Sequence, residues 1–369
     1  MSLKEIFCQD KAIEILQRAF AADKVPHAYI FAGLDGIGKF KTAAEWGKLL
    51  LCKKPVIKND FADSCGKCDS CQGCETASHP DFNHVYKELL EFTKEGKGKK
   101  TPIDFPIDVV REFIIEKASN KPTLSERKIF VISEAEKLNT SSQNCLLKIL
   151  EEPPASCCLI LLCSRLDKLL PTIKSRCQII RFSPIDEQII TEKLKETGVK
   201  QIPAQYFARL SGGSVGQALQ WAKLELSAGQ LYQIKKDLIT SLAGYKYSDS
   251  LEISERFLAE AKKITAAWEE IDETTSKSDL NRRAIKTVLQ IIISALSDAM
   301  KLPVTGDTIV NSDQKEHIKT LAARFDPPEA ASKIEGCYKA TQWLEANVNE
   351  KLIFDHLLLN LAISDKMKI

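Results

Sequence analysis

The segment that most restricts the fold of this chain is AYIFAGLDGIGKFKTA, residues 28–43, where an apolar run passes directly into a glycine-rich turn and then a helical pattern. Gly33, Gly38 and Lys39 stand where the phosphate-binding pattern G-x-x-x-x-G-K-[ST] places them. Phe40, however, occupies the position of the hydroxyl that reaches a magnesium ion in that pattern. A strand, a glycine-rich loop and a helix in this order predict an α/β unit whose nucleotide-type loop lacks one metal contact.

The sequence beyond this loop alternates between strand and helix patterns. Three further apolar runs have the length of buried strands: residues 127–133, 157–164 and 177–184. Helical patterns over residues 107–119 and 135–154 precede the first and the second of these runs, and the pattern over 135–154 is stopped by Pro153 and Pro154. Strands that alternate with helices favour a parallel sheet covered on both faces.

The β-branched runs end near Pro184, and helical patterns continue from there. We therefore predict an α/β core over residues 1–183, with a cysteine-rich insertion at about residues 52–80. A helical lid over residues 184–223 and an all-α domain over residues 224–369 are expected to follow. A chain of 369 residues, 44% of them hydrophobic, is too long for one core, which agrees with several domains.

Charge and composition exclude several classes of protein. The 52 basic and 50 acidic side chains leave a net charge of +2, so any contact with nucleic acid must come from a local patch. The densest basic run has no interleaved aromatic residues and fits a solvated loop: Lys94, Lys97, Lys99 and Lys100. We find neither an apolar run of membrane-spanning length nor a signal peptide, and expect a cytoplasmic protein without a membrane span.

Five of the twelve cysteines crowd into one short segment with the spacing C-x12-C-x2-C-x2-C-x2-C: Cys52, Cys65, Cys68, Cys71 and Cys74. Four thiolates suit tetrahedral Zn²⁺, and two-residue gaps let a tight turn aim successive sulfurs at one point. The last gap resembles that of the iron–sulfur run C-x2-C-x2-C-x3-C-P, but it is one residue short and Glu75 replaces the proline. Zinc is therefore the favoured metal, and counting leaves open which four cysteines bind it.

Several segments, taken in order, are similar to those of one known family: HAYIFAGLDGIGK, CGKCDSC, SHPDF, IDVVREF, KIFVISEAEKLN, NCLLKILEEPP, TIKSRCQIIRF and LSGGSVGQAL. Through these segments, about the first 220 residues resemble the bacterial replicative clamp loaders of the AAA+ superfamily, and among them the delta-prime family of DNA polymerase III. The C-terminal third matches more loosely, through its helical character and NEKLIFDHLLLNL. The resemblance implies an α/β AAA+ core, a helical lid and a helical collar, within a hetero-oligomer that opens a ring-shaped sliding clamp and places it on primed DNA.

The nucleotide site of such a chain is expected to be degenerate. Gly36, Gly38 and Lys39 keep the phosphate cradle and its charge, whereas Phe40 removes a metal contact. Thr42 cannot replace that hydroxyl, because two residues further along a helix lie about 200° around its axis. Nucleotide binding by this loop is expected to be weak or absent.

Two further departures emerge by comparison with active members of the superfamily. The active members carry Asp and then Glu at the end of a core strand, where this chain has Ser133 and Glu134. Their lid commonly carries an Arg that contacts the γ-phosphate, where this chain has Gly216. The resemblance therefore implies a subunit of the DNA polymerase III holoenzyme without ATPase activity of its own.

The resemblance also assigns roles to individual residues. TIKSRCQ is similar to the family's Ser-Arg-Cys motif, whose arginine enters the ATP site of the neighbouring subunit, so Arg176 is the expected arginine finger. The family pattern selects one set of ligands for a structural zinc: Cys52, Cys65, Cys68 and Cys71. Cys74 is then spare, and His79 is structural.

Two other functions stay open at this point. The chain could be an active AAA+ ATPase of the same family, or a zinc-dependent module that binds nucleic acid itself. The remaining histidines look like ordinary core or surface residues: His27, His84, His317 and His356.

Overall fold

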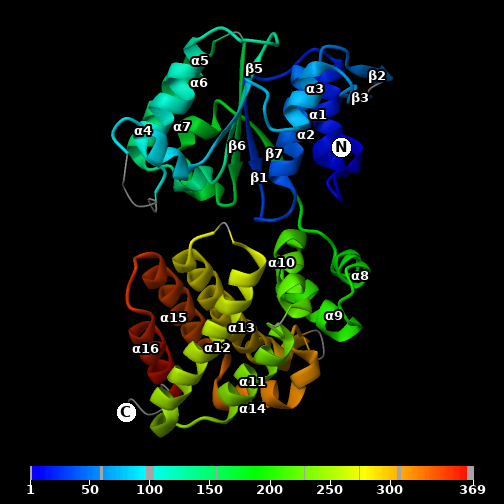
Figure 1. The fold of residues 1–369 in the computed structure, drawn as a ribbon. Coiled ribbons are helices and arrows are strands. Elements are labelled where there is room, and N and C mark those ends of the chain that lie inside the picture. The colour runs from blue at the N-terminus through cyan, green and yellow to red at the C-terminus, as the bar shows by residue number, and fades with distance from the viewer. Residues whose placement is uncertain are drawn as a thin grey trace. The chain divides into compact units, whose positions relative to one another are not determined.

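The computed structural model describes residues 2–58, 61–96, 104–154, 156–227, 229–273, 275–305 and 309–363. The chain divides into two compact units, Met1–Ile185 and Asp186–Ile369, the first α/β and the second helical (Figure 1). Lys97, Lys99 and Lys100 of the basic run lie outside the described residues. The separation of a lid from an all-α domain stays a prediction.

The first unit is built on a five-stranded sheet. Its strands are β1 (Ala28–Ala32), β4 (Phe82–Val85), β5 (Lys128–Ile132), β6 (Cys157–Cys163) and β7 (Gln178–Arg181). Their order is β4-β5-β6-β1-β7, and every neighbouring pair runs parallel. The predicted parallel α/β core is therefore confirmed, and the edge strand β4 is an addition that the apolar runs did not predict.

Helices cover both faces of this sheet (Figure 1): α1 (Asp10–Ala21), α2 (Lys39–Leu51), α4 (Ile107–Val110), α5 (Glu116–Ser119), α6 (Thr140–Glu151) and α7 (Pro171–Lys174). Val131 of β5 belongs to the core that contains Trp46 of α2, whereas Phe130 belongs to the core that contains Leu146 of α6. Burial on both faces explains why the central strands are continuous apolar runs rather than alternating ones.

The helix predicted over residues 107–119 is present, with a π-helical turn, η3 (Arg111–Ile115), between α4 and α5. The chain also contains short 3₁₀ helices: η1 (Leu3–Glu5), η2 (Lys87–Phe92), η4 (Ala135–Lys137), η5 (Leu166–Lys168), η6 (Tyr247–Asp249) and η7 (Ser312–Gln314).

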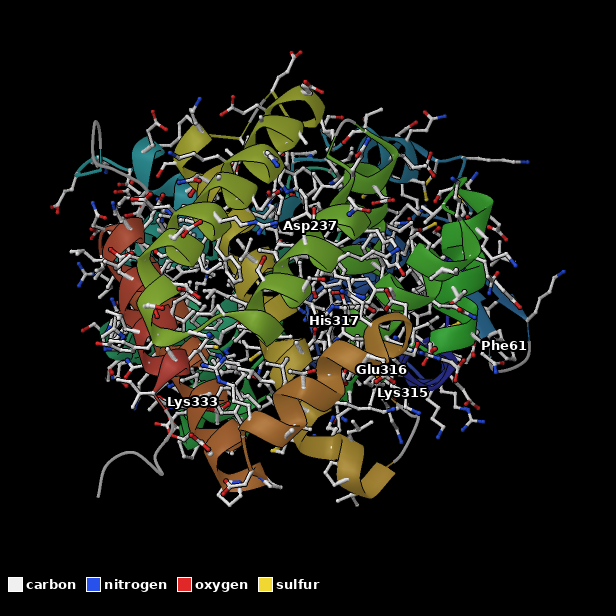
Figure 2. All side chains as sticks on the ribbon, turned by 90° about the horizontal axis from the view of Figure 1, so that it is seen from below. Phe61, Asp237, Lys315, Glu316, His317 and Lys333 are labelled. Carbon is white, nitrogen blue, oxygen red and sulfur yellow. The ribbon has the colours of Figure 1, made fainter. Side chains whose placement is uncertain are left out.

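The cysteine-rich insertion lies between α2 and β4. It consists of the hairpin β2 (Val56–Lys58) and β3 (Phe61–Asp63), followed by helix α3 (Asp69–Glu75). The side-chain amide of Gln17 on α1 donates to the carbonyl oxygen of Ala62 at 3.1 Å, which ties the hairpin to the core. Phe61 stands on the outer side of the hairpin with half of its surface exposed (Figure 2).

The second unit is helical in its described residues. It contains α8 (Glu187–Glu196), α9 (Gln201–Leu210), α10 (Val215–Leu226), α11 (Leu231–Gly244), α12 (Ser250–Ile271), α13 (Lys277–Thr305), α14 (Lys315–Arg324), α15 (Pro327–Glu345) and α16 (Glu350–Ala362). Helices α8, α9 and α10 pack on one another, and α13 packs against α11, α12, α14 and α15.

Helix α13 is long and apolar enough to cross a membrane by length and composition, with a mean hydropathy of 1.3 over its most apolar stretch. Many of its apolar side chains are buried against the surrounding helices: Val288, Leu289 and Leu296 are each at most 1% exposed. The helix therefore has the packing of the core helix of a helical domain.

Gly47 lets α2 approach β4 closely. A Cβ atom at this position would lie 2.6 Å from Cε2 of Phe82 and 3.3 Å from Ile129. We predict that Gly47→Ala lowers the free energy of unfolding of the α/β unit by about 1–2 kcal/mol, because overpacking outweighs the gain in helix propensity. Denaturant unfolding and hydrogen exchange of the β4 and β5 amides would measure the effect.

The matched control is Gly73→Ala on α3, where a new Cβ would lie 3.5 Å from His79, an ordinary contact distance. This variant should keep or slightly raise stability, and Phe82→Leu should rescue Gly47→Ala. Equal effects of the two alanines would contradict this account of the α2–β4 contact.

Candidate functional site

The nucleotide-type loop lies between β1 and α2, at the carboxyl edge of the parallel sheet. Gly36 and Gly38 adopt φ values of +76° and +100°, which favour glycine, and Gly38 leads directly into α2. Lys39 is 6% exposed, and its ammonium group donates to the carbonyl oxygens of Gly33 and, at 2.7 Å, Leu34. The charge that would neutralise a phosphate is thus held by the loop's own backbone.

The hydroxyl of Thr42 is also engaged locally. Thr42 is fully buried, and its Oγ1 donates to the carbonyl oxygen of Gly38 at 3.0 Å. This contact agrees with the expectation that Thr42 does not supply the hydroxyl that Phe40 replaces.

The two positions expected to anchor a metal are linked through a third residue. The ring of Phe40 lies against the imidazole of His84 on β4, with a centroid distance of 4.6 Å. Ser133, which follows β5, makes a hydrogen bond between its Oγ and Nε2 of His84 at 2.8 Å. The ring of Tyr86 also lies against His84 in a tilted arrangement, with 4.9 Å between ring centroids. The sequence analysis placed His84 among ordinary residues and missed this cluster.

Glu134 does not have the surroundings of a residue that orients an attacking water. Its backbone is left-handed, with φ of +51°. One carboxylate oxygen contacts the ammonium of Lys137, and the other lies 3.6 Å from that of Lys87. Two ammonium groups therefore share this carboxylate.

Arg176 lies between α7 and β7, with about a third of its side chain exposed. Its guanidinium forms an ion pair with Glu151 at 2.9 Å, and donates to the carbonyl oxygen of Thr172 at 3.1 Å. Because about a third of the Arg176 side chain is exposed, it is partly accessible to solvent.

The loop and Arg176 lie at opposite edges of the sheet. Tyr29 of β1 pairs with Gln178 of β7, and Ala32 pairs with Arg181 in the same parallel register. Arg176 lies before the first paired residue of β7, at the amino end of the strand, whereas the loop follows the last residue of β1, at its carboxyl end. At about 3.3 Å per residue, the five residues of β1 separate the two edges by about 15 Å. Arg176 is thus placed away from the nucleotide-type loop of its own chain.

Four of the five clustered cysteines come together: Cys52, Cys65, Cys68 and Cys71. Their sulfur atoms all lie within 4.8 Å of one another, with separations of 4.0 Å for Cys52–Cys68, 3.9 Å for Cys65–Cys71 and 3.5 Å for Cys68–Cys71. Zn–S bonds of about 2.3 Å would place the sulfurs of a tetrahedral site about 3.8 Å apart. The cluster therefore has the residues and the size to hold a metal such as zinc.

Backbone groups support a charged sulfur in this cluster. The backbone N–H of Lys67 points at Cys65 and is the main reason that the pKa of this thiol falls to about 6. Cys74 is different, because burial raises the pKa of its thiol to about 12 and its side chain packs against the apolar core. Cys74 lies outside the four-sulfur group. All twelve cysteines are described, and each is free of disulfide bonds.

A buried carboxylate joins the cysteine-rich insertion to the sheet. Asp81 is fully buried and accepts hydrogen bonds from the backbone N–H groups of Thr123, Leu124 and Ser125 at 2.7–2.9 Å. Burial alone would raise its pKa, but the three N–H donors hold the pKa below its usual value. His79 accepts from the N–H of Asp81 at 3.1 Å, which agrees with its predicted structural role.

Two of the other histidines belong to the second unit. His317 lies near the start of α14, as Figure 2 shows, and His356 of α16 makes an edge contact with Trp343. Gly216 lies in the first turn of α10, in the second unit.

Comparison with known proteins identifies similar families for both units. Residues 8–186 match the family described as "DNA polymerase III, delta subunit", and residues 248–362 match "DNA polymerase III, delta subunit, C terminal". The chain is 24% identical to the DNA polymerase III subunit delta′ of Bacillus subtilis, over 96% of both chains. It is 27% identical to that of Escherichia coli, over 94% of this chain and 92% of the relative. Identity to that of Pseudomonas aeruginosa is 37%, over 58% of this chain and 63% of the relative.

The four-cysteine cluster predicts the metal content of the purified protein. We expect about one zinc ion per chain, a large loss of zinc in Cys65→Ser, and wild-type zinc content in the control Cys74→Ser. Elemental analysis of the purified proteins measures this directly, and chelation should loosen the insertion in hydrogen exchange. Bound iron, or loss of zinc in Cys74→Ser, would contradict the assignment.

Asp81 predicts a pH-dependent stability. Asp81→Asn should cost about 2–4 kcal/mol at pH 7, because buried N–H donors lose a charged acceptor. Since the folded-state pKa is depressed, this contribution is present above the unfolded pKa of about 3.9 and is lost as the pH falls through the lower folded pKa.

The stability difference between wild type and Asp81→Asn should therefore shrink as the pH falls below about 4, which denaturant unfolding at several pH values would show. Asp69→Asn is the control, because this carboxylate is 83% exposed. A difference that persists unchanged at low pH would rule out the charged-acceptor explanation.

Proposed function

Because the chain belongs to the delta-prime family of DNA polymerase III clamp-loader subunits, we propose that it works in this AAA+ assembly without hydrolysing ATP itself and supplies Arg176 to a neighbouring subunit's ATP site. The observation that carries the proposal is the separation of Arg176 from its own nucleotide-type loop, at opposite edges of one parallel sheet.

The absence of hydrolysis by this chain is supported by the contacts of its loop. A P-loop ATPase needs a hydroxyl and a carboxylate for magnesium, and a free residue to orient water. Here Phe40 and Ser133 contact His84, and Glu134 is shared by two lysines. Lys39 is bound by the loop's own carbonyl oxygens. Each group that would take part in hydrolysis is absent or already engaged.

The role of Arg176 is supported by its exposure and by the nature of its partner. Glu151 is half exposed, so its ion pair with Arg176 is a surface pair of low free energy that a phosphate group could replace. An arginine supplied from outside stabilises the negative charge that develops on the transferring phosphoryl group. Hydrolysis by the neighbour would then depend on correct assembly.

The remaining parts of the chain complete the proposal. Zinc held by Cys52, Cys65, Cys68 and Cys71 would cross-link the insertion, with no open position for chemistry. The packing of α8, α9 and α10 on one another supports a small lid, with the following helices as a collar that joins the other subunits. Contact with the sliding clamp and with primed DNA would arise through the assembly, because the net charge is near zero.

Arg176→Ala tests this proposal in the reconstituted clamp loader with its ATPase partners, sliding clamp and primed DNA. We expect hydrolysis at the neighbouring site to fall by about 10³-fold or more, while size-exclusion chromatography shows an intact complex. Arg176→Lys should also fail, because an ammonium lacks the planar donor geometry of the guanidinium.

Arg181→Ala is the matched control, since Arg181 lies on β7 at the opposite edge of the sheet. It should leave assembly and hydrolysis unchanged. Full hydrolysis by an intact Arg176→Ala complex, or turnover of Mg-ATP by the isolated wild-type chain, would contradict the proposal.

A further inference from the structure

His84 occupies a particular place in the nucleotide-type site. In the phosphate-binding pattern, magnesium lies between the residue that follows the loop lysine and the acidic residue at the end of a neighbouring strand. Those positions are Phe40 and Ser133 in this chain. Both contact the imidazole of His84, at 4.6 Å between ring centroids for Phe40 and at 2.8 Å between Oγ and Nε2 for Ser133.

We propose that His84 fills the metal position of this site and is the residue that excludes a magnesium–nucleotide complex from the loop. This inference rests on the proposed function, since it explains how the site is kept free of nucleotide. It also means that the site is closed by an added side chain, and not only by the two missing ligands.

The fold places His84 under the start of α2. On β4, Phe82 and His84 lie two residues apart and face the same side of the sheet. Phe82 lies beneath Gly47, in the middle of α2, and His84 lies beneath Phe40, close to its first residue. Helix α2 thus runs antiparallel to β4 and brings Phe40, near its amino end, against the imidazole.

The imidazole makes three side-chain contacts. The rings of Phe40 and Tyr86 lie against it in tilted arrangements, at 4.6 Å and 4.9 Å between ring centroids, and Ser133 makes a hydrogen bond with Nε2. A rotation of the ring away from the site would break these contacts together. His84 and Phe40 are both exposed, so the ring is positioned by these three contacts and not by burial.

Magnesium does not fit this arrangement. Mg²⁺ requires six oxygen ligands in a nearly ideal octahedron at about 2.0–2.1 Å, and imidazole is a poor ligand for it. An oxygen of the side chain at position 133 that is hydrogen-bonded to His84 points at the imidazole and not at a metal ion. Restoring both oxygen ligands should therefore be insufficient while His84 is present.

Restoration variants of the full chain test the inference. The double variant Phe40→Thr, Ser133→Asp returns both oxygen ligands, and the triple variant adds His84→Ala. With a fluorescent ATP analogue as the probe, we expect magnesium to change the affinity of the double variant less than about twofold and that of the triple variant at least about tenfold. Thermal melts with and without Mg-ATP provide a second measurement on the folded fraction.

Asn83→Ala, added to the double variant in place of His84→Ala, is the matched control. Asn83 neighbours His84 on β4, but its side chain faces the other side of the sheet, where it contacts Lys117. It should give no gain in magnesium-dependent affinity. If the triple variant does not fold, a second pair of variants tests the same point. The magnesium-dependent affinity of Phe40→Thr is compared with that of Phe40→Thr combined with His84→Ala, in which the position beside the restored hydroxyl is open.

Tight magnesium-dependent binding by the double variant would overturn the inference, and so would a folded triple variant without that gain. Either result leaves the trans role of Arg176 untouched, because these variants are assayed as the isolated chain. Mg-ATP turnover by the wild-type chain would instead overturn the proposed function.

Discussion

The parallel direction of all five strands is the constraint on which the rest of this structure depends. Parallel strands give a sheet two chemically different edges: here the carboxyl ends carry the loop and Ser133, and the amino end of β7 receives Arg176. A residue at one edge cannot serve a site at the other, because about 15 Å of sheet lies between them. The topology that places the nucleotide-type loop at one end of the strands therefore places Arg176 at the other end.

The degenerate site has gained contacts as well as losing ligands. Lys39 is bound by loop carbonyl oxygens, Thr42 bonds back along its helix, and Phe40, His84 and Ser133 form one cluster. Groups that in an active site must stay open for substrate have here become packing and hydrogen-bond partners. The α/β core thus combines a nucleotide-type loop with contacts that engage the loop's own polar groups.

Much of the core could be predicted from the sequence, because strands buried on both faces are continuous apolar runs. Edge strand β4 could not, since FNHV is short and half polar. His84 and Asp81 were misjudged or missed for the same reason: their partners, Phe40, Ser133 and the turn at residues 123–125, lie more than 40 residues away. Once β4 is known, strand alternation places Phe82 and His84 on one face, which would have drawn attention to the histidine. The cysteine spacing, in contrast, was informative because three of the four sulfurs are local.

The most direct test of the central claim is a structure of the assembled clamp loader with a transition-state analogue of ATP hydrolysis. The account predicts that the guanidinium of Arg176 has left Glu151 and lies within hydrogen-bond distance of the analogue in the neighbouring subunit, with His84 still between Phe40 and Ser133. An analogue bound with magnesium in this chain's own loop, or Arg176 still paired with Glu151 beside an occupied neighbouring site, would contradict it.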